Sequence, residues 1–168
     1  GSVITSYSIT TSPSIGSSSL PSLQTATISQ TGAIAITGSI TDSRGRSMTM
    51  STSITVHEYS TPTFSATDYY RATNTGERND TDGTYAYLKA TFACSSISGR
   101  NTVTGSVVVK QVGGSYTTSS NITSGTGITL GGGSLATDAT YTVTFTIMDT
   151  VGTVSTFAGE ISSASYII

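Results

Sequence analysis

The chain has 168 residues, only 10% of them charged, and a formal net charge of −2. This length admits one or two small domains. No cluster of Lys or Arg offers the basic stripe that a nucleic-acid partner requires, and no apolar run is long enough for a membrane span or a signal segment. We therefore expect neither a nucleic-acid partner nor membrane insertion.

Ser and Thr together make up more than a third of the chain, and apolar residues, at 35%, alternate with them. A hydroxyl-rich chain can be disordered, but regular alternation with the β-branched Thr is typical of half-buried antiparallel strands. The composition therefore predicts an all-β protein. Gly1-Ser2 resembles the remnant of an expression tag, which indicates a fragment of a longer protein.

Four strands are expected in a first domain over residues 1–58. They cover residues 3–10, 23–29, 32–40 and 47–56. Four strands are few for an Ig-like β-sandwich, so this domain is either a reduced sandwich or lacks its leading strands. Pro62 marks a connector near the boundary, because proline cannot donate a hydrogen bond to a sheet.

A second domain, residues 59–168, is expected to be a complete Ig-like or fibronectin type III-like β-sandwich of about seven strands. Short strands separated by turn signals at intervals of roughly 8–12 residues are typical of antiparallel sandwiches. Leu135 and Tyr141 resemble a tyrosine corner, in which the tyrosine hydroxyl bonds back to the backbone upstream. The fold class predicted is thus a tandem of antiparallel Ig-like β-sandwich modules. The seven strands are expected at residues 63–72, 84–94, 102–110, 113–120, 127–133, 140–148 and 153–161.

One supersecondary unit occurs twice in the chain, at an offset of 107 residues (149 − 42). Asp42 and Gly45 follow one alternating strand, and Asp149 and Gly152 follow another with the same spacing. An Asp that bonds its own backbone, followed by a Gly at positive φ, is typical of a tight turn. We expect two equivalent hairpins here, not two functional sites. The offset also aligns the inward positions Ile34, Ile36, Ile40 and Ile54 with Tyr141, Val143, Ile147 and Ile161.

The residues give little sign of catalysis. His57 is the only histidine, no G-x-S-x-G motif accompanies the serines, and the single Cys94 is expected to be a buried, inert side chain. We predict that the protein is not an enzyme and uses no cofactor. Asp80 and Asp82 open like a calcium loop, but the Gly and Glu of an EF-hand are missing, so they are only weak metal candidates.

Tyrosines form the strongest candidate for a binding surface. Tyr69, Tyr70 and Arg71 are adjacent, and Tyr85 and Tyr87 are expected to point outward from the neighbouring strand. Exposed Tyr with Arg is typical of binding hot spots. The alternative is that these residues pack against one another or against the other domain.

Several motifs occur in the order found in siphophage minor structural proteins built from Ig-like modules. Over roughly residues 34–168 the chain resembles that family. The motifs are D-S-R-G-R at residues 42–46, Y-x-x-P at 59–62, R-x-x-x-x-G at 71–76, D-G-T-Y at 82–85 and Asn101-Thr102.

This resemblance implies a tail-tip or tail-fibre component of a phage or prophage of Gram-positive bacteria. Such a virion structural protein lies in the tail, outside cells, and serves host attachment by extending the tail and contacting the host surface. Its partners would be other virion tail proteins and a host cell-surface glycan or protein. The resemblance implies no active site. The alternative function is a carbohydrate-binding adhesin module of a bacterial surface or secreted protein.

Overall fold

Every strand in the described residues runs antiparallel to its neighbours in the sheet. The computed structural model describes residues 1–164, which form eleven strands in three antiparallel sheets and no helix. The prediction of an all-β antiparallel fold is therefore confirmed. The chain divides into two compact units, Gly1–Glu58 and Tyr59–Ile168.

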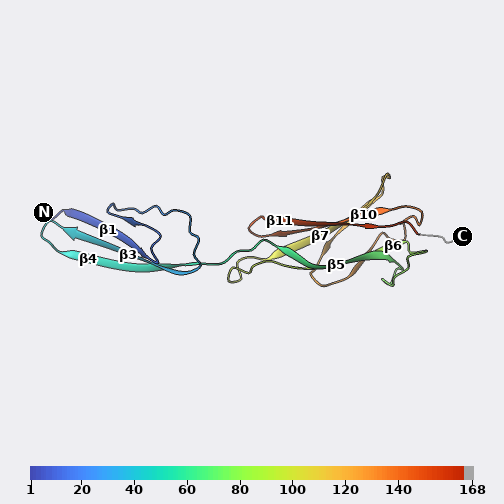
Figure 1. Cartoon of the computed structure of the whole chain (residues 1–168), viewed down its shortest axis with the longest axis horizontal. Helices are drawn as coiled ribbons and strands as arrows, with labels where there is room; N and C mark the ends of the chain where they lie inside the picture. The colour runs from blue at the N-terminus through green and yellow to red at the C-terminus, as the bar shows by residue number, and fades with distance from the viewer. Residues whose placement is uncertain (165–168) are drawn as a thin grey trace. The chain divides into compact units, whose positions relative to one another are not determined.

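The first unit is a single four-stranded sheet with the order β2-β1-β3-β4. A long connection joins β2 to β3 (Figure 1). Residues 23–29, predicted as a strand, lie in this connection and form none, so that prediction is wrong. The strands are β1 (Ile4–Ser12), β2 (Ser17–Ser18), β3 (Gly32–Asp42) and β4 (Ser47–Val56).

The second unit is a seven-stranded, two-layer sandwich of the Ig-like type. One sheet has the order β5-β6-β9 and the other β11-β10-β7-β8. Figure 1 shows β10 and β11 in one layer and β5 and β6 in the other. The strands are β5 (Thr63–Ala72), β6 (Tyr85–Ala93), β7 (Val103–Gln111), β8 (Thr117–Ile122), β9 (Ile128–Leu130), β10 (Tyr141–Asp149) and β11 (Val154–Ile161).

The core of the second unit lies between its two sheets. Strand alternation sends every second side chain inward, so β10 contributes Tyr141, Val143, Phe145 and Ile147, all at most 1% exposed. Aromatic rings fill the centre, where Phe64 meets Phe145 at 6.4 Å between ring centroids. Burial of such apolar surface is the main stabilising term of the unit.

A tyrosine corner closes the sandwich, as predicted. The hydroxyl of Tyr141 accepts a hydrogen bond from the backbone amide of Ala136 at 2.8 Å, and Leu135 is 1% exposed. Cys94, by contrast, lies just beyond the end of β6 and is only half-buried, so the prediction of full burial is wrong. The side-chain alternation of β6 no longer applies to it there.

The two repeated turns have the same backbone geometry. Gly45 has a φ of +77° and Gly152 a φ of +95°, the region that glycine enters without steric cost. In both turns the Gly amide donates to the carbonyl of the Asp three residues earlier, at 2.9 Å to Asp42 and 3.0 Å to Asp149. The prediction of two equivalent hairpins is confirmed.

Candidate functional site

The five tyrosine and arginine residues predicted to bind do not share one surface. Tyr69 and Arg71 lie on the face of β5 that packs into the core, whereas Tyr70 lies on the opposite face and pairs with Tyr87 of β6. Tyr85 lies on the outward face with Tyr87 and is half-buried. Arg71 is 2% exposed, so the expectation that it points outward is wrong, because successive strand residues point to opposite faces. Tyr69 is half-buried, and Tyr69, Tyr70 and Arg71 line one hollow of about 330 Å³ together with Arg78.

Tyr69 is part of the aromatic core of the second unit. Its ring centroid lies 6.4 Å from that of Phe145 and 6.0 Å from that of Phe157. Gly159 of β11 has no side chain where the Tyr69 ring lies, and a Cβ there would overlap the ring. Tyr69 thus packs the two sheets together.

Arg71 is buried and links several loops through hydrogen bonds. The residue is 2% exposed, and its guanidinium carbon lies 5.6 Å from the centroid of the Tyr141 ring. Burial lowers the pKa of the Arg71 guanidinium from its ordinary value, while Tyr141 and Asp138 oppose that shift. The guanidinium donates to four backbone carbonyls, which are those of Gly83, Ala136, Ala139 and Ser162.

Tyr70, Tyr87 and Arg78 form a stack on the outward face of the β5–β6 pair. The two rings lie 4.7 Å apart at an interplanar angle of 14°, and the Arg78 guanidinium carbon lies 5.4 Å from the Tyr70 ring centroid. Burial raises the pKa of Tyr70, and Tyr87 and Asp68 raise it further, against the opposing effect of Arg78. Tyr70 and Tyr87 are half-buried, which leaves part of each ring accessible. Ligand binding by this stack, with Tyr85 beside it, stays a prediction.

The acidic loop of the weak metal candidates folds around its own polar groups. Asp80 pairs with Arg78 at 2.8 Å, and the Asn79 side-chain oxygen accepts the Asp82 amide at 2.9 Å. Among residues 1–164, no group of three or more His, Cys, Asp or Glu side chains is placed to hold a metal ion. Asp80 and Asp82 thus act in a turn stabilised by local hydrogen bonds.

Asp149 is the centre of a buried polar network at one end of the second unit. Its Oδ2 accepts hydrogen bonds from the Asn101 side-chain amide at 3.1 Å and from the Tyr59 hydroxyl at 3.0 Å, and its Oδ1 accepts the Thr153 amide at 2.9 Å. Burial tends to raise the pKa of Asp149, but these hydrogen bonds outweigh it and the pKa lies below its ordinary value. The network fixes the β10–β11 turn to the entry segment of the unit.

The motifs noted in the sequence contact one another in this unit. Tyr59 of Y-x-x-P and Asn101 both bind Asp149, and Arg71 donates to the carbonyl of Gly83 in D-G-T-Y. The sequence motifs include these residues, but their contacts could not be predicted, because the residues lie up to 90 positions apart in the chain. These residues connect distant segments of the sandwich through hydrogen bonds.

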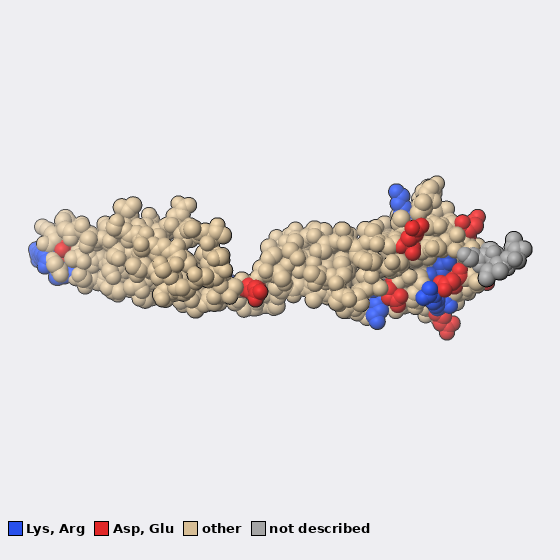
Figure 2. All heavy atoms as spheres, in the orientation of Figure 1, with Lys and Arg blue, Asp and Glu red and all other residues tan. Residues whose placement is uncertain are grey.

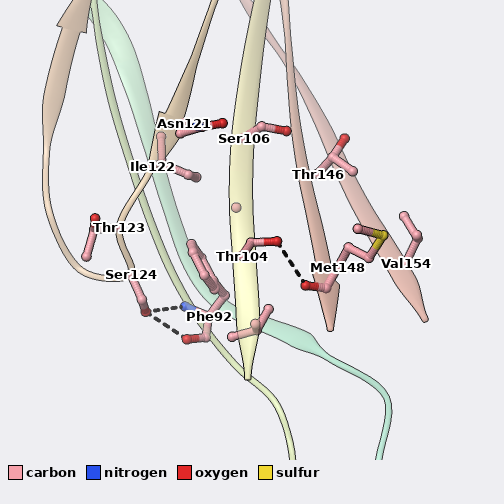
Figure 3. A pocket seen from close by; sticks show the side chains of 12 residues that line it. Phe92, Thr104, Ser106, Asn121, Ile122, Thr123, Ser124, Thr146, Met148 and Val154 are labelled. Carbon is pink, nitrogen blue, oxygen red and sulfur yellow. Dashed lines mark hydrogen bonds between the residues drawn. The ribbon is translucent and has the colours of Figure 1, made fainter. Parts of the chain in front are cut away.

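A groove lies where β7 and its neighbours near the Asp149 end leave a hollow of about 720 Å³ (Figure 3). Gly105 is among its lining residues, and a Cβ on Gly105 would approach Phe92 to 2.6 Å and Ile122 to 2.9 Å. Phe92 and Ile122 are the apolar part of the lining, and outward-facing hydroxyl and amide side chains also line the groove. They are Thr104, Ser106, Asn121 and Thr146, with Met148 and Val154 at one side.

The groove combines hydroxyl and amide groups with apolar carbon. Thr104 donates to the Met148 carbonyl at 3.2 Å, and the Ser124 hydroxyl donates to the Phe92 carbonyl at 2.7 Å, as the dashed lines in Figure 3 show. The Asn121 side chain is exposed on the outward face of β8. Sequence reasoning missed this groove, because a Ser- and Thr-rich strand carries no signal that sets one such residue apart.

Comparison with known proteins gives no family assignment: no protein-family model and no curated protein matches the chain. Among the described residues, no helix has the length and apolarity needed to cross a membrane.

Proposed function

We propose that the chain is an Ig-like structural module of a phage or prophage tail tip or tail fibre, which extends the tail and contacts the host surface. The observation that carries this proposal is the use made of its buried polar side chains. The buried side chains form hydrogen bonds with backbone carbonyls, with backbone amides and with one another, and so hold loops and turns in place. They are those of Arg71, Asn101 and Asp149. A spacer that transmits load between neighbours needs such joints.

The resemblance to siphophage minor structural proteins supports the same proposal. Its motif residues include Tyr59, Arg71 and Asn101, which are the side chains that form the joints. In such a virion the partners are other tail proteins, and the location is the extracellular tail. The module needs neither a cofactor nor a catalytic step for this role.

The test is immunogold labelling of phage particles released from the bacterium that carries the gene. We expect an antibody against residues 59–168 to label the distal end of the tail, and mass spectrometry of gradient-purified particles to detect the protein. Absence of the protein from purified particles, with secreted or wall-bound protein in the same culture, would overturn the proposal.

A carbohydrate-binding adhesin module is the second candidate, favoured by the groove around Gly105. Sugars bind through hydroxyl and amide hydrogen bonds together with apolar contact, and the groove offers Asn121 and Ser106 beside Met148. A glycan array tests it with Asn121→Ala as the groove variant. The control is Ser119→Ala, on the same strand and face but outside the groove. Binding that only Asn121→Ala removes supports this candidate, and an array without binding rejects it.

A further inference from the structure

The segment that leads into the second unit is attached to the sandwich before the first strand of that unit begins. Strand β4 ends at Val56 and β5 begins at Thr63. Of the residues between them, Tyr59, Ser60 and Pro62 make hydrogen bonds to the rest of the second unit. Only residues 57 and 58 therefore lie between the end of β4 and the first attached residue.

The first point of attachment is the hydroxyl of Tyr59. It donates a hydrogen bond to Asp149 Oδ2 at 3.0 Å and lies 2.5 Å from Thr153 Oγ1, so it reaches both ends of the β10–β11 turn. Tyr59 is 39% exposed, whereas Asp149 is 3% exposed. Because the stabilisation from apolar burial scales with the area that is covered, the ring contributes little and the hydroxyl is the main attachment.

The second point of attachment is the backbone of Ser60. Its amide donates to Ser95 Oγ at 3.0 Å, and the Ser95 hydroxyl donates to the Ser60 carbonyl at 3.1 Å. The carbonyl of Ser95 in turn accepts the Asn101 side-chain amide at 2.9 Å, and the same amide donates to Asp149. Both points of attachment thus depend on one buried pair, Asn101 and Asp149.

Pro62 is held more firmly than the residues before it. Its side chain is fully buried, and its carbonyl accepts a hydrogen bond from the Ser155 hydroxyl at 2.6 Å. Ser60 and Thr61 are exposed. The segment can therefore detach as far as Thr61 without uncovering the apolar core, and detachment stops at Pro62.

We propose that residues 59–61 act as a clip that sets the length of the linker between the two units. With the clip closed, the linker consists of residues 57 and 58, and with the clip open it consists of residues 57–61. The three added residues extend its reach by roughly 10 Å while the sandwich stays folded. A few hydrogen bonds at the surface hold the clip, so it opens at a lower free energy than the packed core does. Such a clip suits a tail module and an adhesin alike.

Cleavage after Glu58 by a glutamyl endopeptidase measures the opening of the clip, because residues 59–61 directly follow the bond that is cut. Glu58 is exposed, and Figure 2 shows acidic atoms in red at the surface where the chain passes from the first unit to the second. Glu160 in β11 is the internal reference, since a strand is cut only when the sandwich opens. Mass spectrometry of the whole chain over time separates the two cuts by their fragments.

The two variants, Tyr59→Phe and Ser95→Ala, each remove one point of attachment. Ser95→Ala leaves the sequence around Glu58 unchanged, so it does not alter recognition by the protease. The control is Ser119→Ala, which removes an exposed hydroxyl on β8. We expect both clip variants to speed cleavage after Glu58 by about three- to tenfold, because cleavage follows the open population and the closed state has lost a hydrogen bond. Cleavage after Glu160, and both cuts in Ser119→Ala, should keep the wild-type rate.

Either of two results would overturn the proposal. Cleavage after Glu58 at the wild-type rate in both clip variants shows that these hydrogen bonds do not control the linker. Cleavage after Glu58 and Glu160 that accelerates by the same factor shows that the segment is released only when the whole sandwich unfolds.

Discussion

At the scale of single residues, one position in the repeated turn performs two tasks. Asp42 and Asp149 each accept, through Oδ1, the backbone amide four residues further on, at 3.0 Å and 2.9 Å. Their Oδ2 atoms differ, because that of Asp42 bonds to the Arg46 guanidinium and that of Asp149 to the Asn101 amide. The turn is thus common to both units, and only the second copy ties it to a distant strand.

Asp42 makes the free energy of unfolding of the first unit depend on pH. Hydrogen bonds from Arg46 and Ser2 lower the pKa of Asp42 from its ordinary 3.8 to about 2. Since the folded-state pKa lies below that of the unfolded chain, the carboxylate stabilises the fold above pH 3.8, and this contribution is lost as the pH falls through about 2. We expect Asp42→Asn to unfold at a lower temperature at neutral pH.

The difference between wild type and Asp42→Asn should shrink as the pH is lowered through that window. Thermal unfolding at a series of pH values measures it, and Asp68→Asn, an exposed residue of the second unit, is the control. A difference that stays constant from neutral pH down to pH 2 would show that the ionised form of Asp42 contributes nothing.

At the scale of elements, closing contacts hold the sandwich where strands end. The Tyr141 hydroxyl meets the Ala136 amide at the start of β10, and the buried Arg71 links neighbouring loops. These bonds satisfy backbone groups that no sheet ladder reaches. The tyrosine corner and the hairpins were predictable from local spacing, since each involves residues close in sequence.

Removing one hydroxyl tests the tyrosine corner. We expect Tyr141→Phe to lower the free energy of unfolding of the second unit by about 0.5–1.5 kcal/mol, because it deletes one hydrogen bond and keeps the ring in place. Tyr85→Phe is the matched control, because Tyr85 is a half-buried tyrosine on the outward face of β6. Urea unfolding gives both values, and equal losses for the two variants would contradict the role assigned to the corner.

Two glycines test whether the inner faces differ in packing. Gly105 has the Phe92 ring 2.6 Å from its Cβ position, whereas Gly38 has nothing within 4 Å. Gly105→Ala should destabilise the second unit by about 1–3 kcal/mol through overpacking. Gly38→Ala should be neutral or stabilise by up to about 1 kcal/mol, since the strand tolerates a methyl group and the unfolded chain loses freedom. Comparable losses at both positions, measured by urea unfolding, would mean that the face at Gly38 is covered.

At the scale of the whole molecule, alternation predicted the fold class but not which faces are covered. The seven strands of the second unit follow from alternating side chains and turn residues, and the first unit shows the same alternation in β3 and β4. Ile40 and Ile54 are expected at inward positions but are 37% and 42% exposed, because burial depends on an opposing layer that alternation does not encode.

The β3–β4 and β10–β11 hairpins share one register, but β5 and β6 pack over the second, whereas no strand of residues 1–58 packs over the first. Amide hydrogen exchange of the dilute chain, read by mass spectrometry, compares β3 with β10 directly. We expect amides of Ile34–Thr41 to exchange much faster than those of Tyr141–Met148, because opening of a single sheet costs less free energy than opening of a packed sandwich. Equal protection of β3 and β10 in dilute protein would contradict this difference in packing.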